Sequence, residues 1–107
     1  MTTMITVEKT IGQKYIEKYP DRIPIIIDPH NVNIRKTKFL VSNDCTMGYL
    51  IVCIRKHMSL KPEESMIVFI NNVIPKMTDT LGDLHGQYMN PEDYCLHVTV
   101  TKENVFG

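Results

Sequence analysis

The chain has 107 residues, of which 43% are apolar and 22% are charged, and this length suits one compact domain with a single core. Twelve basic side chains balance twelve acidic ones, so the molecule as a whole has no net field that attracts nucleic acid or an anionic membrane. The start lacks the pattern of a signal peptide, and no stretch approaches the roughly 20 apolar residues that span a bilayer. We therefore expect a cytoplasmic protein that reaches membranes through covalent attachment or a partner.

The first part of the chain predicts a helix followed by a hairpin. Apolar side chains recur every three or four residues over 7–19, which is typical of an amphipathic helix, and Pro20 ends it. Residues 23–28 form a β-branched run that leads into turn residues. Residues 39–41 form a second apolar run, so we expect these two strands to pair in the antiparallel direction.

A second helix is expected from about residue 46 to 57, with Asp44 or Thr46 as its N-cap. Its apolar residues recur with helical spacing, which predicts one stripe that packs against the sheet. The members of this stripe are Met47, Leu50, Ile51 and Ile54.

The last part of the chain predicts further strands and a short helix. Residues 65–70 form a third strand, and the Asn71-Asn72 turn predicts a hairpin with a short strand over 73–75. A short helix is expected over 80–88. Residues 94–101 alternate between apolar and polar side chains, which predicts the last strand.

This order of elements is typical of an α+β fold, the ubiquitin-like β-grasp, in which one helix covers a mixed four-stranded sheet. The first and last strands are then neighbours in the centre of the sheet. The additional N-terminal helix is expected on the opposite face. The predicted organisation is a short extension over 1–6, a domain over 7–102 and a tail over 103–107 that ends in Gly107.

Catalytic motifs are missing from the sequence: it has no nucleophile elbow, phosphate-binding loop or dinucleotide-binding loop. Its histidines are dispersed, without a second histidine or cysteine at metal-ligand spacing: His30, His57, His85 and His97. Its odd number of cysteines predicts reduced, structural thiols: Cys45, Cys53 and Cys95. We expect no metal, no cofactor and no enzymatic activity. The alternative is an enzyme that pairs one of these cysteines with a histidine.

Several short motifs occur in order along the chain. They are Lys18-Tyr19-Pro20-Asp21-Arg22-Ile23-Pro24-Ile25-Ile26, Lys38-Phe39-Leu40-Val41, Thr46-Met47-Gly48, Ile54-Arg55-Lys56, Phe69-Ile70-Asn71-Asn72-Val73-Ile74-Pro75 and Glu103-Asn104-Val105-Phe106-Gly107. This series resembles the autophagy ubiquitin-like modifiers, the family of GABARAP and the microtubule-associated protein light chains. The resemblance extends from about residue 11 to Gly107.

The resemblance implies a modifier and not an enzyme. Gly107 would be activated with ATP by an activating enzyme, passed as a thioester to a conjugating enzyme, and joined to the amine of phosphatidylethanolamine. The lipidated protein would then act in autophagosome formation and recruit cargo receptors to the autophagosomal membrane. Two acyl chains would supply the membrane affinity that the sequence lacks. The alternative is a non-conjugated peptide-binding adaptor of the same fold that acts in vesicle trafficking.

The resemblance also implies a groove for peptides with an aromatic-x-x-aliphatic motif, which add a strand beside residues 39–41. The aromatic pocket would be formed by Tyr15, Pro24, Ile26, Lys38, Leu40 and Cys95. The aliphatic pocket would be formed by Phe39, Val41, Cys45, Leu50 and Cys53. Acidic residues beside the motif would meet Arg22, Lys36 and Arg55.

Four features depart from the family pattern. The family usually has two N-terminal helices, and the sequence predicts one. Cys95 stands where a phenylalanine is usual in the aromatic pocket, and Cys53 stands where a leucine is usual in the aliphatic pocket. Smaller side chains predict deeper pockets. Ser42 replaces a proline after the second strand, and no residue follows Gly107, whereas most members need a protease to expose the glycine.

Overall fold

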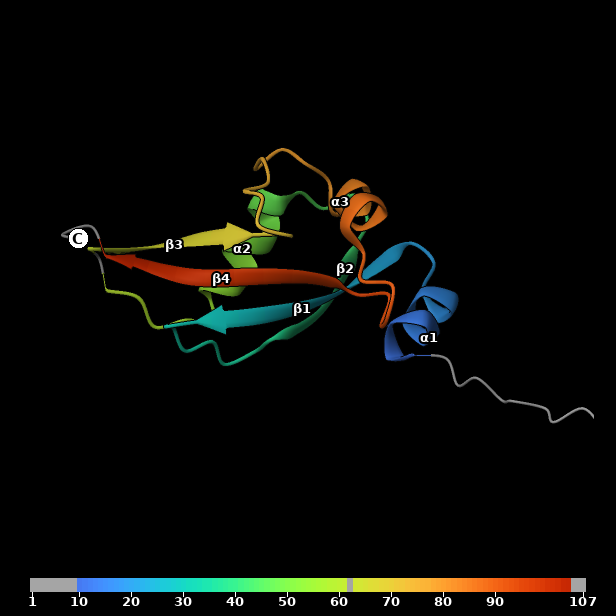
Figure 1. Ribbon diagram of the computed structural model, residues 1–107, viewed down its shortest axis with the longest axis horizontal. Helices are drawn as coiled ribbons and strands as arrows, with labels where there is room; N and C mark the ends of the chain where they lie inside the picture. Colours follow the sequence, from blue (N-terminus) through green and yellow to red (C-terminus); the bar gives the residue numbers. More distant parts are fainter. Residues whose placement is uncertain (1–9, 62, 105–107) are drawn as a thin grey trace, which may run out of the picture.

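A computed structural model describes residues 10–61 and 63–104, and Figure 1 shows helices arranged around one four-stranded sheet. In chain order the elements are α1 (Ile11–Lys18), β1 (Arg22–His30), β2 (Lys38–Ser42), α2 (Met47–Arg55), β3 (Glu64–Phe69), α3 (Leu81–Tyr88) and β4 (Leu96–Asn104). The predicted α+β fold is confirmed. Within the described residues, no helix has the length and apolar character that crossing a membrane requires.

The sheet has the order β2-β1-β4-β3, which leaves β2 and β3 at its two edges. The first and last strands pair in parallel at the centre, as predicted, and Ile25 lies opposite Leu96. β2 is antiparallel to β1, and β3 is antiparallel to β4. Because β1 and β4 run in the same direction, both end at the side of the molecule opposite α1 (Figure 1).

The two faces of the sheet differ because side chains alternate along each strand. One face is buried in the core, and its residues in the central strands are Ile23, Ile25, Ile27, Leu96, Val98 and Val100. α2 supplies Met47, Leu50 and Ile54 to the same core, which confirms three of the four residues of the predicted stripe as fully buried. Pro24, Ile26 and Cys95 occupy the intervening positions and face the other way. α1 covers one end of that second face, as expected.

α1 begins at Ile11, four residues later than the sequence predicted. Thr10 has an extended backbone and forms a capping box, in which its hydroxyl accepts a hydrogen bond from Gln13 N at 3.1 Å. The Gln13 side chain accepts one from Thr10 N at 2.8 Å in return. Residues 7–9 of the predicted helix and the extension over 1–6 lie outside the described residues. The N-cap of α2 is Thr46, one of the two predicted residues.

The strand predicted over 73–75 is wrong, whereas the turn before it is confirmed. Asn71 and Asn72 have φ angles of 49° and 65°, which asparagine tolerates in tight turns. After the turn Val73 makes a single bridge to Ile70. Ile74 is 61% exposed and Pro75 lacks an N–H donor. This segment therefore has no buried apolar face, and its one bridge to Ile70 does not extend into a strand.

β4 is displaced toward the C-terminus relative to the prediction. Tyr94 has a φ angle of 61°, in the left-handed region, so the strand begins only at Leu96. At the other end Glu103 and Asn104 pair with Ser65 and Glu64 of β3. The strand thus includes the first two residues of the predicted tail, and residues 105–107 lie outside the described residues.

Gly12 is the point at which α1 packs closely against the start of β4. A Cβ atom at Gly12 would lie 1.9 Å from the Asp93 carbonyl oxygen and 3.0 Å from Cys95 Sγ. Gly12→Ala should therefore displace α1 and lower the free energy of unfolding by roughly 1–3 kcal/mol. Chemical denaturation measures this change.

Gly86→Ala is the matched control, because it makes the same substitution in α3, where a Cβ would meet no atom within 4 Å. It should raise the free energy of unfolding by roughly 0.5–1 kcal/mol through the helix propensity of alanine. Equal effects of the two substitutions would contradict the close packing at Gly12.

Candidate functional site

β2 offers an open edge for another strand. Thr37 O accepts a hydrogen bond from Ile27 N at 2.7 Å. In an antiparallel ladder alternate residues bond to the partner strand, so Phe39 and Val41 continue this pattern toward β1. The backbone groups of Lys38 and Leu40 therefore point outward from the sheet. An extended peptide can pair with them in the manner of β-strand addition.

A cavity of about 470 Å³ lies beside this edge on the face that carries α1. It is lined by Gly12, Tyr15, Pro24, Ile25, Ile26, Lys38, Phe39, Leu40, Asp93 and Cys95. All six residues predicted for the aromatic pocket are in this set. The structure therefore brings together residues from α1, β1, β2 and the start of β4, which are far apart in the sequence.

The lining of the cavity is mostly apolar, with Lys38 and Asp93 as its charged residues. This combination suits a large apolar side chain of a ligand that carries one hydrogen-bonding atom. Burial, followed by the charge of Asp93, raises the pKa of Cys95 to about 11, although Lys38 acts in the opposite direction. The Cys95 thiol is therefore protonated at neutral pH, and its place in the cavity is that of an apolar wall.

Asp93 connects the cavity to its surroundings. Its carbonyl oxygen accepts a hydrogen bond from the Thr10 hydroxyl at 3.0 Å, which fixes the start of α1. Its carboxylate accepts one from Cys95 N at 2.9 Å and lies 2.6 Å from His97 Nε2. The other ring nitrogen of His97 lies 3.4 Å from Asp28 Oδ2. A histidine carrying two protons donates to both carboxylates at once.

The pKa of His97 reflects opposing effects. Partial burial alone would lower this pKa, but the hydrogen bond and charge of Asp93, with those of Asp28, raise it above its ordinary value. Burial likewise opposes ionisation of Asp93, but the hydrogen bonds from Cys95 N and His97 lower the pKa of that carboxyl. The pair therefore favours a protonated His97 and an ionised Asp93 together. Neither Asp93 nor His97 was assigned to a functional site from the sequence.

The residues predicted for the aliphatic pocket have unequal access to a ligand. Phe39 and Val41 of β2 alternate with Lys38 and Leu40 and pack, partly buried, against the core. Cys45 and Cys53 are also partly buried. Leu50 has no exposed surface. It belongs to the core, so it can support such a pocket from below but does not reach a ligand.

Tyr49 interacts with the cysteines of this predicted pocket and is 53% exposed. Its hydrogen bond with Cys53, and then the charges of Cys53 and Cys45 when ionised, raise the pKa of Tyr49. The Tyr49 phenol is thus a polar group beside Cys53 that a ligand at this predicted pocket would meet. The prediction missed Tyr49, although its position four residues before Cys53 on one helix face was a usable signal.

Three basic residues are predicted to contact acidic residues beside the peptide motif, and two of them lie at the ends of β2. Arg22 lies opposite Ser42 at one end of the strand. Lys36 precedes the other end, with Nζ 4.9 Å from the centroid of the Phe39 ring. Arg55 lies in the last turn of α2. Gly107, the predicted conjugation residue, lies outside the described residues, and within the described ones no group of three or more acidic, histidine or cysteine side chains could hold a metal.

Comparisons with known proteins agree with this geometry. A family model described as autophagy protein Atg8, ubiquitin-like, matches residues 8–107. The crystal structure of Trypanosoma brucei ATG8 is 31% identical in sequence, with a TM-score of 0.74 over 90% of this chain and 85% of that chain. Plasmodium falciparum Atg8, solved in complex with a Plasmodium falciparum Atg3 peptide, is 30% identical in sequence. Its TM-score is 0.72, and the match covers 83% of this chain and 82% of that chain.

The contact between His97 and Asp93 predicts a pH-dependent contribution to stability. Because the folded-state pKa of His97 is raised, its contribution is fully present below the unfolded value of about 6.5 and is lost as the pH rises through the folded value. The difference in unfolding free energy between the wild type and His97→Gln should therefore shrink between about pH 5.5 and about pH 8.5. Denaturation at both pH values measures it.

The matched control is His30→Gln, since His30 is an exposed histidine at the end of β1 that makes neither contact. Its effect on stability should be small. An effect of His97→Gln that grows with rising pH would contradict the proposed ion pair.

Proposed function

The chain belongs to the Atg8 family of ubiquitin-like autophagy proteins, and we propose that it is a modifier conjugated through Gly107 to phosphatidylethanolamine. β4 leads directly to the last three residues and ends away from the groove, at the side opposite α1 (Figure 1). An enzyme can therefore take the tail without displacing the sheet. A family of modifiers is not a catalytic family, and the protonated thiol of Cys95 agrees with a substrate and not an enzyme.

The partners follow from this chemistry. The Gly107 carboxylate needs activation with ATP before an amine can attack it, so an activating enzyme and a conjugating enzyme are required. The Plasmodium Atg8 structure contains an Atg3 peptide, and we extend a contact of this kind to the present chain. Lipidation would move the protein from the cytoplasm to the autophagosomal membrane, where it acts in autophagosome formation. No cofactor or nucleic acid is required.

The observation that carries the recognition function is the open edge of β2 beside the apolar cavity. The edge supplies backbone pairing for an extended peptide, and the cavity of about 470 Å³ accepts an aromatic anchor. An aliphatic anchor three residues later would lie near Phe39, Val41, Cys45 and Cys53, with Tyr49 beside it. Cargo receptors with an aromatic-x-x-aliphatic motif fit this arrangement.

Deletion of Gly107 should abolish lipidation. The deletion puts the terminal carboxylate on Phe106, whose bulk a narrow enzyme channel would exclude, and it leaves the described fold intact, because the last core residue of the described part is Val100. The measurement is incubation with matched activating and conjugating enzymes, ATP and phosphatidylethanolamine liposomes, followed by mass spectrometry of the C-terminus. Normal lipidation of the deletion variant would contradict the proposal. A full chain that binds peptide but is never lipidated would favour the alternative, a non-conjugated adaptor in vesicle trafficking.

Leu40→Arg should abolish binding of a Trp-x-x-Leu peptide. An unpaired guanidinium in the cavity should cost about 3 kcal/mol or more, which is over a hundredfold in Kd. Ile67→Arg is the matched control, because it makes the same change on the other edge strand, β3. Calorimetry should show a near-normal Kd for that control. The opposite ranking of the two variants would place the groove at β3.

Cys95→Phe should change which aromatic anchor is preferred. Added bulk narrows the cavity, so selection between Trp and Phe anchors should change by roughly tenfold or more. Peptides with Trp, Phe and Tyr anchors test this by calorimetry. Cys53→Leu adds bulk at the other pocket and should leave their ranking unchanged. An unchanged ranking in Cys95→Phe with a lowered Tm would mean that Phe instead displaces α1 at Gly12.

A further inference from the structure

Two segments of the chain are basic and contain no carboxylate, although the net charge of the protein is zero. They are residues 29–38 and 55–61. Together they hold half of the twelve lysines and arginines: Arg35, Lys36, Lys38, Arg55, Lys56 and Lys61. The balanced composition therefore hides a strong local asymmetry.

The fold joins these two segments. Ile34 and Met58 form a β-bridge, and Arg35 N donates to His57 O at 2.8 Å. The Arg35 guanidinium donates to Lys56 O at 2.8 Å and to Ser59 Oγ at 3.3 Å. Arg35 thus fixes the second segment with its side chain while its charge stays without an acidic partner. We call Arg35, Lys36, Lys56 and Lys61 the basic patch.

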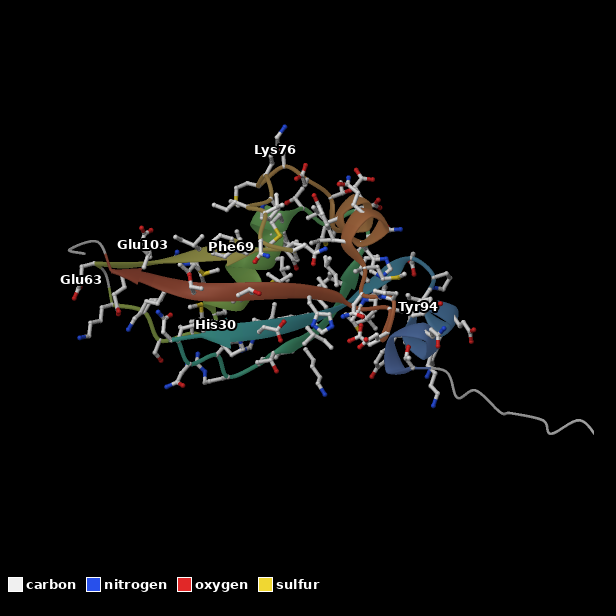
Figure 2. The ribbon with its side chains drawn as sticks, viewed as in Figure 1. His30, Glu63, Phe69, Lys76, Tyr94 and Glu103 are labelled. Atoms are coloured by element: carbon white, nitrogen blue, oxygen red, sulfur yellow. The ribbon has the colours of Figure 1, made fainter. Side chains whose placement is uncertain are left out.

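The charges of the basic patch are only partly compensated by the described residues, since Lys61 alone has a described carboxylate, Glu64, that its charge acts on. None of its four side chains forms an ion pair with a described carboxylate. The nearby Glu64 is already engaged, because its carboxylate lies 2.9 Å from Lys102 Nζ and accepts a hydrogen bond from Lys61 N at 3.0 Å. Glu63 and Glu103 lie at the end of the sheet where β4 finishes, on the side of β3 (Figure 2). The loop that carries Arg35 and Lys36 instead connects β1 to β2, at the other edge of the sheet.

The basic patch lies at the end of the sheet where the chain leaves β4. Lys102 N donates to Asn31 Oδ1 at 2.9 Å, which ties β4 to the first basic segment. A polar cavity of about 470 Å³ lies between these elements, lined by Asn31, Val32, Asn33, Ser59 and Lys102. Its amide and hydroxyl groups are donors that suit a phosphate, whereas the Lys102 ammonium is already paired with Glu64.

We propose that the basic patch and this polar cavity bind anionic phospholipid headgroups of the membrane to which the chain is conjugated. This inference rests on the proposed lipidation at Gly107. Gly107 is three residues beyond Asn104, a separation of at most about 10 Å when extended. The lipidated end must therefore remain within about one Debye length of the lipid phosphates. A soluble acidic partner would not account for the position of the patch beside the conjugated tail.

The contact would orient the conjugated protein. Each basic residue near an anionic leaflet contributes about fivefold to binding, and the covalent anchor keeps the patch at a high effective concentration of headgroups. A membrane against this end lies opposite α1, whose Tyr15 lines the peptide cavity. The groove would then be held away from the bilayer, where receptors can reach it.

The test uses the full, unconjugated chain, so that it does not depend on lipidation. Partition onto phosphatidylcholine vesicles is compared with partition onto vesicles that also contain phosphatidylserine, at low salt. We expect binding to the anionic vesicles only, and a roughly tenfold or larger loss of it in the double variant Lys56→Gln with Lys61→Gln. The control double variant, Lys14→Gln with Lys76→Gln, removes the same charge from α1 and from the loop after β3, and should bind normally.

The outcomes separate this inference from the proposed function. Equal binding to both kinds of vesicle, or equal losses in the two double variants, would overturn it even if lipidation proceeds. Loss of lipidation in the conjugation assay, with anionic binding retained, would contradict the proposed function alone. A glutamate-rich peptide that binds through Lys56 and Lys61 while anionic vesicles do not would assign the patch to an acidic protein partner instead. A normal Tm and normal Trp-x-x-Leu affinity show that the variants are folded.

Discussion

The parallel pairing of β1 with β4 is the constraint on which the rest of the structure depends. It joins the first and last strands of the described chain, with Ile25 opposite Leu96 and Ile27 opposite Val98. All four of these side chains are almost completely buried. With these strands at the centre, β2 and β3 become edges, and β2 is the edge next to the strand that carries Pro24 and Ile26. The peptide groove is thus a consequence of the strand order.

The same pairing determines what lies at each end of the sheet. At the end where β4 begins, the turn before it places Asp93 and Cys95 against Gly12 of α1, so the helix closes one side of the cavity. At the end where β4 finishes, the strand enters the tail beside the basic patch. In the proposed function, receptor binding and membrane attachment would therefore be separated by the length of the central strands. This separation would allow one small domain to bind a membrane and a receptor at the same time.

Much of the fold was predictable, because its elements have strong local signals. The alternation over β4, the β-branched run of β1 and the threonine N-cap of α2 all correspond to elements of the structure. The errors came from segments where a local pattern lacked a tertiary partner. Residues 73–75 have β-branched side chains but no face to bury, so they remain a loop. Thr10 was not recognised as the cap that sets the start of α1.

The candidate site was predictable only in part, and by resemblance more than by pattern. The six predicted residues of the aromatic pocket do line one cavity. Asp93 was missed because its place in the cavity depends on the backbone turn at Tyr94, whose left-handed conformation has no clear sequence signal. Leu50 was assigned to a pocket because its family position suggested it, whereas its complete burial depends on the packing of α2. Its helical spacing with Met47 and Ile54 had already predicted this burial, so here the pattern along the helix was a better guide than the resemblance.

The central claim is that a receptor peptide adds a strand to the β2 edge and places its aromatic anchor in the neighbouring cavity. Amide hydrogen exchange, followed residue by residue with and without a Trp-x-x-Leu peptide, tests this most directly. We predict that the amides of Lys38 and Leu40, which point outward from the sheet, become protected on binding, while those of β3 do not change. Protection that appears in β3 and leaves Lys38 and Leu40 unaffected would contradict the account.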